Sequence, residues 1–342
     1  MRPAGQTSSP RNNSIMPHRF IPSSTGSSMP LGILSAVRVT SRMSSPLRSS
    51  RLIIIGLAVI PLIAGLAAGS FLVRTTNRTQ PPPRQVVDLA RAGVTRNADW
   101  QPMTRRLDGL EMALVPAGCF TMGSTDPQLE MAIDSCERFF GSGRCQVDFG
   151  QVESPAHQVC FEHPFWIGET EVTNRLYGSS SSTDMGAMYR GRSWPRESVT
   201  WHEASEFCLA HNGRLPTEAE WEFAARGPDG LIFPWGDEFD LENVISGRLA
   251  PSDVASVPAG VSWVGAFDMS GGIVEWVADW YAPYPEASPT GPQGPLDGQQ
   301  RILRGGSWFS FASFFLRTSH RESASPNIAN STIGFRCARD LE

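Results

Sequence analysis

Lysine is absent from this sequence of 342 residues, so all 29 basic residues are arginines. This excludes a phosphate-binding loop with its lysine, a Schiff-base lysine and a lysine general base. The sequence also lacks the G-x-S-x-G turn of the α/β-hydrolases and the H-E-x-x-H helix of the zinc proteases, since His202-Glu203 is followed by Ala-Ser-Glu. The common hydrolase mechanisms therefore have no support in this chain.

Acidic residues are nearly absent from the first 96 residues, which hold 12 arginines and one acid, Asp88. The acids are concentrated in the rest of the chain, and the whole chain has a formal net charge of −5. An acidic globular part repels a phosphate backbone, so we expect no nucleic-acid partner. The same charge is compatible with divalent cations.

Charged residues are also missing from Leu52–Val73, a run of 22 residues that is long enough to cross a bilayer. Seven arginines lie at or before Arg51, and positive charges beside a membrane span stay on the cytoplasmic side. The N-terminus is thus expected in the cytoplasm and the globular part in the periplasm or outside the cell. We therefore expect a disordered cytoplasmic segment (1–51), a single-pass anchor in the inner or plasma membrane (52–73) and a linker (74–108). The alternative for the apolar run is a cleaved signal peptide.

All six cysteines follow the apolar run, at positions Cys119, Cys136, Cys145, Cys160, Cys208 and Cys337. An even number of cysteines in an exported domain predicts three disulfides, and the sequence alone leaves their connectivity open. A zinc site is the alternative, but the C-x2-C spacing typical of such sites does not occur.

Two capping boxes predict helices. Thr217 with Glu220 begins a short, mostly buried helix that ends at Gly227, and Thr200 with Glu203 begins a helix that ends near His211. A further short helix is expected near Val86–Ala92.

Strands are predicted on both sides of a loop. Leu110–Gly123 is typical of two short strands around a Pro-Ala-Gly turn, and Gln158–Ile167 of a third strand. We interpret the segment between them, Asp126–Gly150, as a surface loop.

Five sequence blocks carry a family resemblance: TEVTN at Thr170–Asn174, GRLPTEAEWEFAARG at Gly213–Gly227, VEWVADWY at Val274–Tyr281, RGGSW at Arg304–Trp308 and GFRCARD at Gly334–Asp340. In this order they resemble the formylglycine-generating enzyme (sulfatase-modifying factor) family over roughly residues 109–341. The resemblance implies an α+β fold over 109–342, a single irregular domain related to the C-type lectin fold.

The resemblance also bears on the disulfides. Cys208 and Cys337 match a pair that is bridged in the family. For the remaining cysteines we predict Cys119–Cys160, which would join two apolar strands, and Cys136–Cys145, which would close a Gly-Ser-Gly loop.

Copper chemistry is where this sequence departs from the family. The family's oxidases hold copper with two cysteine thiolates shortly after the GGS motif, at positions that fall near Ser310 and Phe315. The segment Gly305–Arg321 contains no cysteine. Because Cu(I) needs thiolate or thioether ligands, the chain resembles a member without the copper pair, and we expect neither copper nor formylglycine-generating activity.

A structural calcium site is implied by the block FDMSGGIVEW. By position, its ligands would be the side chains of Asp268 and Glu275 and the carbonyls of Gly271 and Ile273, a set of hard oxygens that suits calcium. The alternative is that Asp268 caps a turn and Glu275 is an ordinary acid. A second family calcium site, near Asn243, has less support because the loop that completes it is short here. Asp268, Glu275 and Asp279 do not have a spacing that identifies the carboxylate pair of a glycosidase.

Ser307 matches a position in the family's substrate groove, Arg304 and Trp308 flank it, and His320 and Arg321 follow on the same surface as candidates for ligand binding. The alternative is that Gly305-Gly306 only permit a tight backbone path. We expect these candidate residues to serve a binding or accessory module that engages a peptide, a cell-envelope component or a partner protein. One alternative is an enzyme of exported, siderophore-type maturation, with catalytic residues that the sequence does not identify. A formylglycine-generating oxidase is a third reading. The six histidines lack the spacing of the family's iron enzymes.

Overall fold

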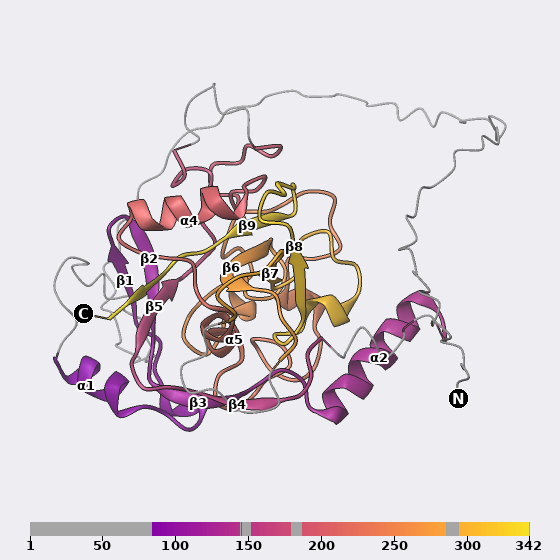
Figure 1. Ribbon diagram of the computed structural model, residues 1–342, viewed down its shortest axis with the longest axis horizontal. Coiled ribbons are helices and arrows are strands. Elements are labelled where there is room, and N and C mark those ends of the chain that lie inside the picture. Colours follow the sequence, from indigo (N-terminus) through magenta and orange to yellow (C-terminus); the bar gives the residue numbers. More distant parts are fainter. Residues whose placement is uncertain (1–83, 144, 146–151, 179–186, 285–293, 342) are drawn as a thin grey trace, which may run out of the picture. The chain divides into compact units, whose positions relative to one another are not determined.

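The computed structural model describes residues 84–143, 145, 152–178, 187–284 and 294–341 (Figure 1). The helices are α1 (Arg84–Ala92), α2 (Asp126–Phe140), α4 (Trp201–Ala210) and α5 (Glu218–Arg226), with short 3-10 helices η1 (Asn97–Asp99), η2 (Leu241–Asn243), η3 (Pro258–Gly260) and η4 (Ser313–Leu316). The strands are β1 (Thr104–Leu107), β2 (Leu110–Val115), β3 (Gly118–Met122), β4 (His157–Phe161), β5 (Phe165–Gly168), β6 (Val274–Trp280), β7 (Arg301–Arg304), β8 (Arg321–Ala324), β9 (Ile333–Phe335) and β10 (Ala338–Asp340).

Helix α5 lies in the middle of this mixed α and β domain, and every one of its residues is buried (Figure 1). The predicted capping box is present at its N-terminus: Thr217 accepts a hydrogen bond from the Glu220 amide at 3.1 Å, and Glu220 accepts one from the Thr217 amide at 2.8 Å. Gly227 ends the helix with φ 67°, a conformation that favours glycine. The helix packs against β3, β6 and β7, so the block Gly213–Gly227 forms the centre of the core.

The first sheet has the strand order β1-β2-β5-β10, with all neighbours antiparallel. It includes residues that the sequence assigned to a linker, since β1 pairs with β2 from Thr104 to Leu107. Ala90 of α1 and Trp100 are buried in the same core. The folded domain therefore begins before residue 109, because this segment carries apolar side chains that the core covers.

Strands β3 and β4 form a two-stranded sheet in which Cys119 lies directly opposite Cys160. All three predicted disulfides are present: Cys119–Cys160, Cys136–Cys145 and Cys208–Cys337. The strand predicted over Gln158–Ile167 is divided into β4 and β5, which belong to different sheets. Pro164 lies in the break, where a residue without an amide hydrogen cannot continue a ladder.

The surface loop predicted over Asp126–Gly150 is wrong for its first part, which is the 15-residue helix α2. Thr125 and Gln128 form a capping box, and Pro127 lies in the first turn, where its missing amide hydrogen costs nothing. Only Ala132 and Cys136 of this helix are buried. A helix that lies mostly on the surface has a polar sequence, and we interpreted that composition as a loop.

The third sheet has the order β8-β7-β6-β9, with β6 antiparallel to β7 and parallel to β9. The register of β6 against β7 shifts between Trp276 and Trp280. A bulge of this kind redirects side chains, and here it lies beside the cavities described below.

The membrane span predicted over residues 52–73 lies outside the described residues, as does the segment 179–186. In the part of the chain that the structure describes, no helix combines the length and apolar character needed to cross a bilayer.

Candidate functional site

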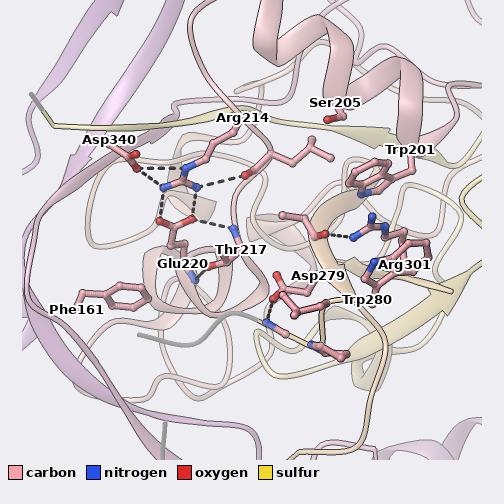
Figure 2. Close-up of a pocket in the computed structure, with 15 residues that line it drawn as sticks. Phe161, Trp201, Ser205, Arg214, Thr217, Glu220, Asp279, Trp280, Arg301 and Asp340 are labelled. Atoms are coloured by element: carbon pink, nitrogen blue, oxygen red, sulfur yellow. Dashed lines mark hydrogen bonds and ion pairs between the residues drawn. The ribbon is translucent and has the colours of Figure 1, made fainter. Parts of the chain in front are cut away.

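Two adjoining cavities open where β6 ends, with volumes of about 610 and 290 Å³. They share Asp279, Trp280, Gly294 and Pro295 as lining residues. The larger cavity also reaches Trp201 at the start of α4 and Arg301 at the start of β7 (Figure 2). Its volume is in the range of small-molecule sites.

One side of the larger cavity is closed by ion pairs. Arg214 donates to both carboxylate oxygens of Glu220, at 2.6 and 2.7 Å, and to Asp340 at 2.5 Å (Figure 2). Burial opposes the charged form of Arg214, but the bonds to Glu220 and Asp340 outweigh it and raise the pKa of this guanidinium. The charges on this side are therefore compensated within the protein.

Asp279 lies between the two cavities and joins two segments. One carboxylate oxygen accepts from the Glu218 amide at the start of α5, and the other from the Gly294 amide, each at 2.6 Å. Burial, followed by the charge of Glu218, raises the pKa of Asp279 to about 6. Both oxygens of Asp279 accept backbone hydrogen bonds, so this arrangement gives no more support for glycosidase chemistry than the sequence did.

Arg301 faces the other side of the larger cavity, between Trp201 and Trp280 (Figure 2). The guanidinium carbon is 3.8 Å from the Trp201 ring centroid and 3.5 Å from that of Trp280. Cation–π contacts on both faces hold this side chain in place.

The smaller cavity contains Arg321, one of the predicted groove residues. Arg321 donates to both oxygens of Glu218, at 2.8 and 2.7 Å, and its guanidinium carbon is 4.0 Å from the Tyr284 ring centroid. His157 packs edge-on against Tyr284 with the ring centroids 4.7 Å apart. Arg321 is buried and fully engaged, so it shapes this cavity chiefly by fixing Glu218 and Tyr284.

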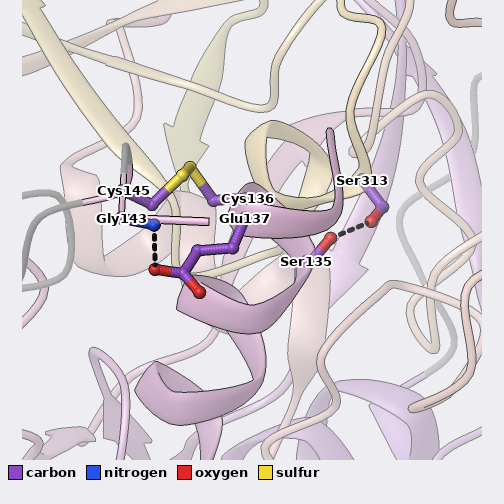
Figure 3. The surroundings of a disulfide bond; sticks show 6 residues. All are labelled: Ser135, Cys136, Glu137, Gly143, Cys145 and Ser313. Atoms are coloured by element: carbon purple, nitrogen blue, oxygen red, sulfur yellow. Dashed lines mark hydrogen bonds between the residues drawn. A yellow bond between two sulfur atoms is a disulfide. The ribbon is translucent and has the colours of Figure 1, made fainter. Parts of the chain in front are cut away.

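The segment that corresponds to the family's copper cysteines packs against α2 (Figure 3). Ser135 of α2 and Ser313 of η4 are 2.6 Å apart and hydrogen bonded. Cys136 and Cys145, joined by their disulfide, pack with Ala312 and Phe314 in a small apolar cluster. The helix that the sequence did not predict therefore packs against this segment.

Ser307 and Trp308 lie on the turn before that segment. The Ser307 amide donates to the Ser310 hydroxyl at 3.0 Å, and the Ser307 hydroxyl accepts from the Phe309 amide at 3.2 Å. The Trp308 side chain is buried, whereas Phe309 and Phe311 are about half exposed, at 51% and 49%. The solvent-facing groups on this turn are thus the two phenylalanines.

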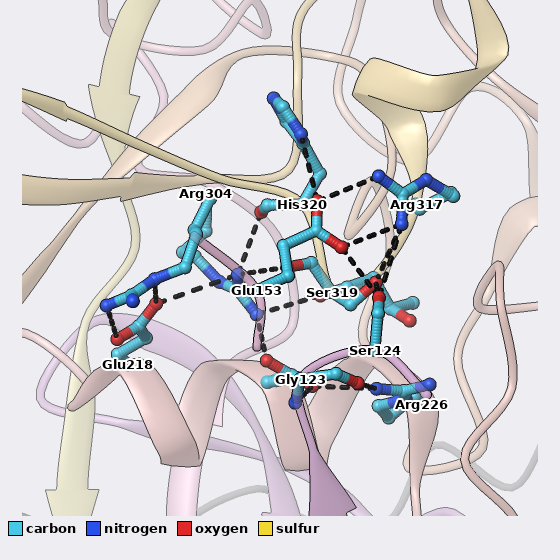
Figure 4. A network of polar contacts seen from close by, with 12 residues as sticks. Gly123, Ser124, Glu153, Glu218, Arg226, Arg304, Arg317, Ser319 and His320 are labelled. Atoms are coloured by element: carbon cyan, nitrogen blue, oxygen red, sulfur yellow. Dashed lines mark hydrogen bonds and ion pairs between the residues drawn. The ribbon is translucent and has the colours of Figure 1, made fainter. Parts of the chain in front are cut away.

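Arg304 belongs to a buried network of charged groups (Figure 4). It forms an ion pair with Glu222 and donates to the carbonyls of Thr318, Ser319 and His320 at 2.8, 2.9 and 2.8 Å. A guanidinium held in this way fixes the chain between β7 and β8. In this structure, Arg304 therefore stabilises the backbone of residues 318–320.

His320 lies in the same network, with Nδ1 3.5 Å from Glu153 and Nε2 3.2 Å from Glu322. Burial opposes protonation, but the contacts with these two carboxylates outweigh it and raise the pKa of His320. Arg317 donates to both oxygens of Glu153, at 2.8 and 2.7 Å. Burial would favour protonation of Glu153, yet Arg317 and His320 hold its pKa well below the ordinary value.

The predicted calcium ligand Glu275 has partners within the protein. It accepts from the Arg336 Nη2 and Nε atoms at 2.6 and 2.7 Å and from the Trp221 indole at 2.9 Å. No three histidine, cysteine, aspartate or glutamate side chains in the described part of the chain are arranged to hold a metal ion. A calcium site here would thus depend on backbone oxygens as well as carboxylates.

Glu171, from the TEVTN block, lies beside Asp268 in the interior. Burial raises the pKa of both carboxyl groups, and the charge of Asp268 raises that of Glu171 further. Both oxygens of Glu171 are buried without a hydrogen-bond partner, while Asp268 accepts from the Ala255 amide at 2.6 Å. Gly272 permits this packing, since a Cβ there would be 2.4 Å from a Glu171 oxygen. The charge of Arg336 offsets the rise in both pKa values in part, and a divalent cation bound between the two carboxyl groups would favour their charged forms.

Sequence reasoning missed Glu171 and the Arg301 stack. Glu171 lies about 100 residues before Asp268, and no local pattern connects the two. Trp201, Trp280 and Arg301 come from three separate elements, so their contact depends on the fold. The sequence contains these tryptophans and this arginine, but nothing in their spacing predicts that they meet.

Comparisons with known proteins agree with this architecture. The chain is 43% identical over 155 residues to the serine/threonine-protein kinase Pkn1 of Chlamydia trachomatis, which covers 43% of this chain and 24% of the kinase. It is 27% identical over 283 residues to the formylglycine-generating enzyme of Mus musculus, covering 67% of this chain and 75% of that enzyme. The chain thus spans only about a quarter of the kinase that it matches.

Among solved structures, PvdO from Pseudomonas aeruginosa superimposes with a TM-score of 0.55 at 24% sequence identity, covering 71% of this chain and all of PvdO. This likeness shows a shared fold. Residues 97–341 match the model of the sulfatase-modifying factor enzyme 1-like domain. The chain belongs to this formylglycine-generating enzyme family.

Proposed function

We propose that this chain is a membrane-anchored, exported member of the family that acts as a binding or accessory module and not as a copper-dependent oxidase. The observation that carries the proposal is the state of the cysteines, because all six are joined in three disulfides. A copper(I) centre of the family type requires two thiolates. This chain offers none.

The two positions that would carry the thiolates support the same proposal. The Ser310 hydroxyl is a hard oxygen that accepts a hydrogen bond from the Ser307 amide at 3.0 Å. Phe315 is a hydrocarbon ring packed against Phe314, with the centroids 3.9 Å apart. Neither side chain is a ligand for a soft metal.

A binding role is supported by the cavities at the end of β6, which are lined by tryptophans and charged side chains. We infer that the ligand is a peptide, a cell-envelope component or a partner protein. The exposed Phe309 and Phe311 provide an apolar surface on the turn that follows the GGS motif.

The oxidase part of the proposal is tested with the purified globular domain, copper and a sulfatase-type peptide that contains cysteine. We expect no conversion to formylglycine. A peptide of lower mass that also reacts with an aldehyde-trapping reagent would refute the proposal. The family member from Mus musculus, assayed in parallel, is the positive control.

The anchor and the direction of export are tested separately. A reporter that is active only outside the cytoplasm, fused after residue 342, should be active and should sediment with membranes. Deletion of residues 52–73 should abolish both results. Reporter activity that is entirely soluble would favour the cleaved signal peptide, and an inactive reporter would contradict export.

A further inference from the structure

Arg301 is a preorganised cation in the wall of the larger cavity. It begins β7, and its guanidinium is stacked between Trp201, the first residue of α4, and Trp280, the last of β6 (Figure 2). The stack occupies both faces of the planar group. Since Nη1 already donates to the Ala278 carbonyl and Nε is buried, the Nη2 end of the edge is the part left to meet a ligand.

Among the described residues, Arg301 forms no ion pair, and the charge of Asp279 in the same cavity offsets only part of the cost of its burial. Its Nη1 atom donates to the Ala278 carbonyl, and its Nε atom is buried without an acceptor. No carboxylate of a described residue forms an ion pair with it. Burial lowers the pKa of Arg301 to about 10, so the group remains charged at neutral pH.

Arg214, in the same cavity, provides the contrast. Its donors are directed at Glu220 and Asp340, and this guanidinium therefore has little left to offer a ligand. Asp279, the remaining acid of the cavity, accepts backbone amides with both oxygens. Arg214 and Asp279 therefore have their hydrogen-bonding groups occupied by the protein, whereas Arg301 is a cation that can still bind a ligand.

We propose that the cavity binds a carboxylate group, with the edge of Arg301 as its partner and the apolar surfaces of Phe161, Trp280 and Leu296 around the rest of the ligand. Planar carboxylates match the donor geometry of a guanidinium edge. A phosphate dianion is disfavoured relative to a carboxylate, because it brings two negative charges to the single cation Arg301 and meets twice the repulsion from Asp279 in the same cavity.

This inference deepens the proposed binding function by naming the chemistry of the ligand. Two sources can supply that chemistry: a free organic acid and the C-terminal end of a peptide. Each is a monoanion attached to an uncharged body, and both fit a volume of about 610 Å³.

The test is a titration of the purified globular domain, followed by tryptophan fluorescence and by NMR shifts of the indole N–H groups. Benzoate is the probe, benzamide its neutral counterpart, and inorganic phosphate the competing anion. N-acetylphenylalanine and its amide represent a peptide end. We expect saturable binding of benzoate or N-acetylphenylalanine, at least about tenfold tighter than binding of the matching amide.

Variants locate the site. Arg301→Gln should reduce carboxylate affinity at least about tenfold. The affinity of Arg301→Lys should lie between those of the wild type and Arg301→Gln, because lysine keeps the charge but lacks the planar pair of donors. Arg106→Gln, at an exposed arginine of β1, is the matched control and should bind as the wild type does.

Three results would overturn the proposal: equal binding of acid and amide, unchanged binding in Arg301→Gln, or tighter binding of phosphate than of either carboxylate. Preference for benzoate over N-acetylphenylalanine would identify a free acid, and the reverse a peptide end. If Arg301→Gln does not fold, the acid-to-amide ratio of the wild type decides. Because none of these titrations measures oxidation, a failure here is distinct from a failure of the non-oxidase proposal.

Discussion

Glu275 and Arg336 form a doubly hydrogen-bonded ion pair in the interior of the domain, with Nη2–Oε1 and Nε–Oε2 distances of 2.6 and 2.7 Å. Both side chains are fully buried. Arg336 also donates to the carbonyls of Gly168 and Phe267, at 2.9 Å in each case. The pair thus links β6 and the C-terminal segment to the first sheet.

We predict that Arg336→Met destabilises the domain by about 3–5 kcal/mol, because it leaves the Glu275 charge buried without its partner. Arg336→Met combined with Glu275→Gln should recover part of that loss, since the second change removes the charge. Denaturant unfolding measures both values. A double variant no more stable than Arg336→Met would show that the loss comes from packing and from the carbonyl bonds.

The second prediction concerns calcium. If Glu171 and Asp268 contribute to a site with nearby backbone oxygens, excess calcium should raise the melting temperature of the globular domain, because the ion binds only the folded state. Glu171→Gln and Asp268→Asn should each abolish the rise. Both are preferable to changes at Glu275, whose loss would break the ion pair with Arg336.

Glu206→Gln, at an exposed acid of α4, is the control and should keep the response to calcium. In chelator, Glu171→Gln should melt at a higher temperature than the wild type, because it removes a buried acid whose oxygens have no hydrogen-bond partner and which lies beside Asp268. Equal melting temperatures of the wild type in calcium and in chelator would count decisively against the site.

A pH dependence follows from Asp279, whose pKa is raised by burial to about 6 from an ordinary value of 3.8. The folded state holds this proton more tightly than the unfolded state does. Proton binding by Asp279 therefore stabilises the folded state fully below the ordinary pKa, and this contribution is lost as the pH rises through about 6. Between about pH 5 and pH 7.5 the loss should be about 1 kcal/mol.

The measurement compares unfolding free energies at the two pH values for the wild type and for Asp279→Asn. The loss of unfolding free energy between the two pH values should be smaller in Asp279→Asn and unchanged in Asp253→Asn, which alters an exposed acid. Other titrating groups contribute equally to all three proteins, so the comparison isolates Asp279. An unchanged pH dependence in Asp279→Asn would refute the assignment.

The disulfides should differ in their contributions to stability. Cys208–Cys337 spans 129 residues and Cys136–Cys145 spans 9. In the chain-entropy model, losing the longer link costs about 5 kcal/mol and losing the shorter one about 2.5 kcal/mol. Paired alanine replacements, compared by denaturant unfolding, test this order. The reverse order would show that packing of Cys136 and Cys145 on η4 outweighs the entropy of the loop.

The sequence by itself determined the features that depend on short-range chemistry. Thr217 with Glu220 and Thr200 with Glu203 lie three residues apart, and such a spacing forms a capping box wherever a helix begins. The cysteine count limited the covalent links, and the family's blocks identified Cys208 and Cys337. The missing cysteines near Ser310 needed no structure to detect.

The tertiary structure decided what depends on contacts between distant segments. Helix α2 has a local start signal in Thr125, Pro127 and Gln128, which sequence reasoning missed, but its packing on η4 depends on the fold. Glu171 meets Asp268, and Arg301 enters between Trp201 and Trp280, because separate strands and helices bring them together. Burial then sets their electrostatics, and burial is a property of the folded chain that no local sequence pattern records.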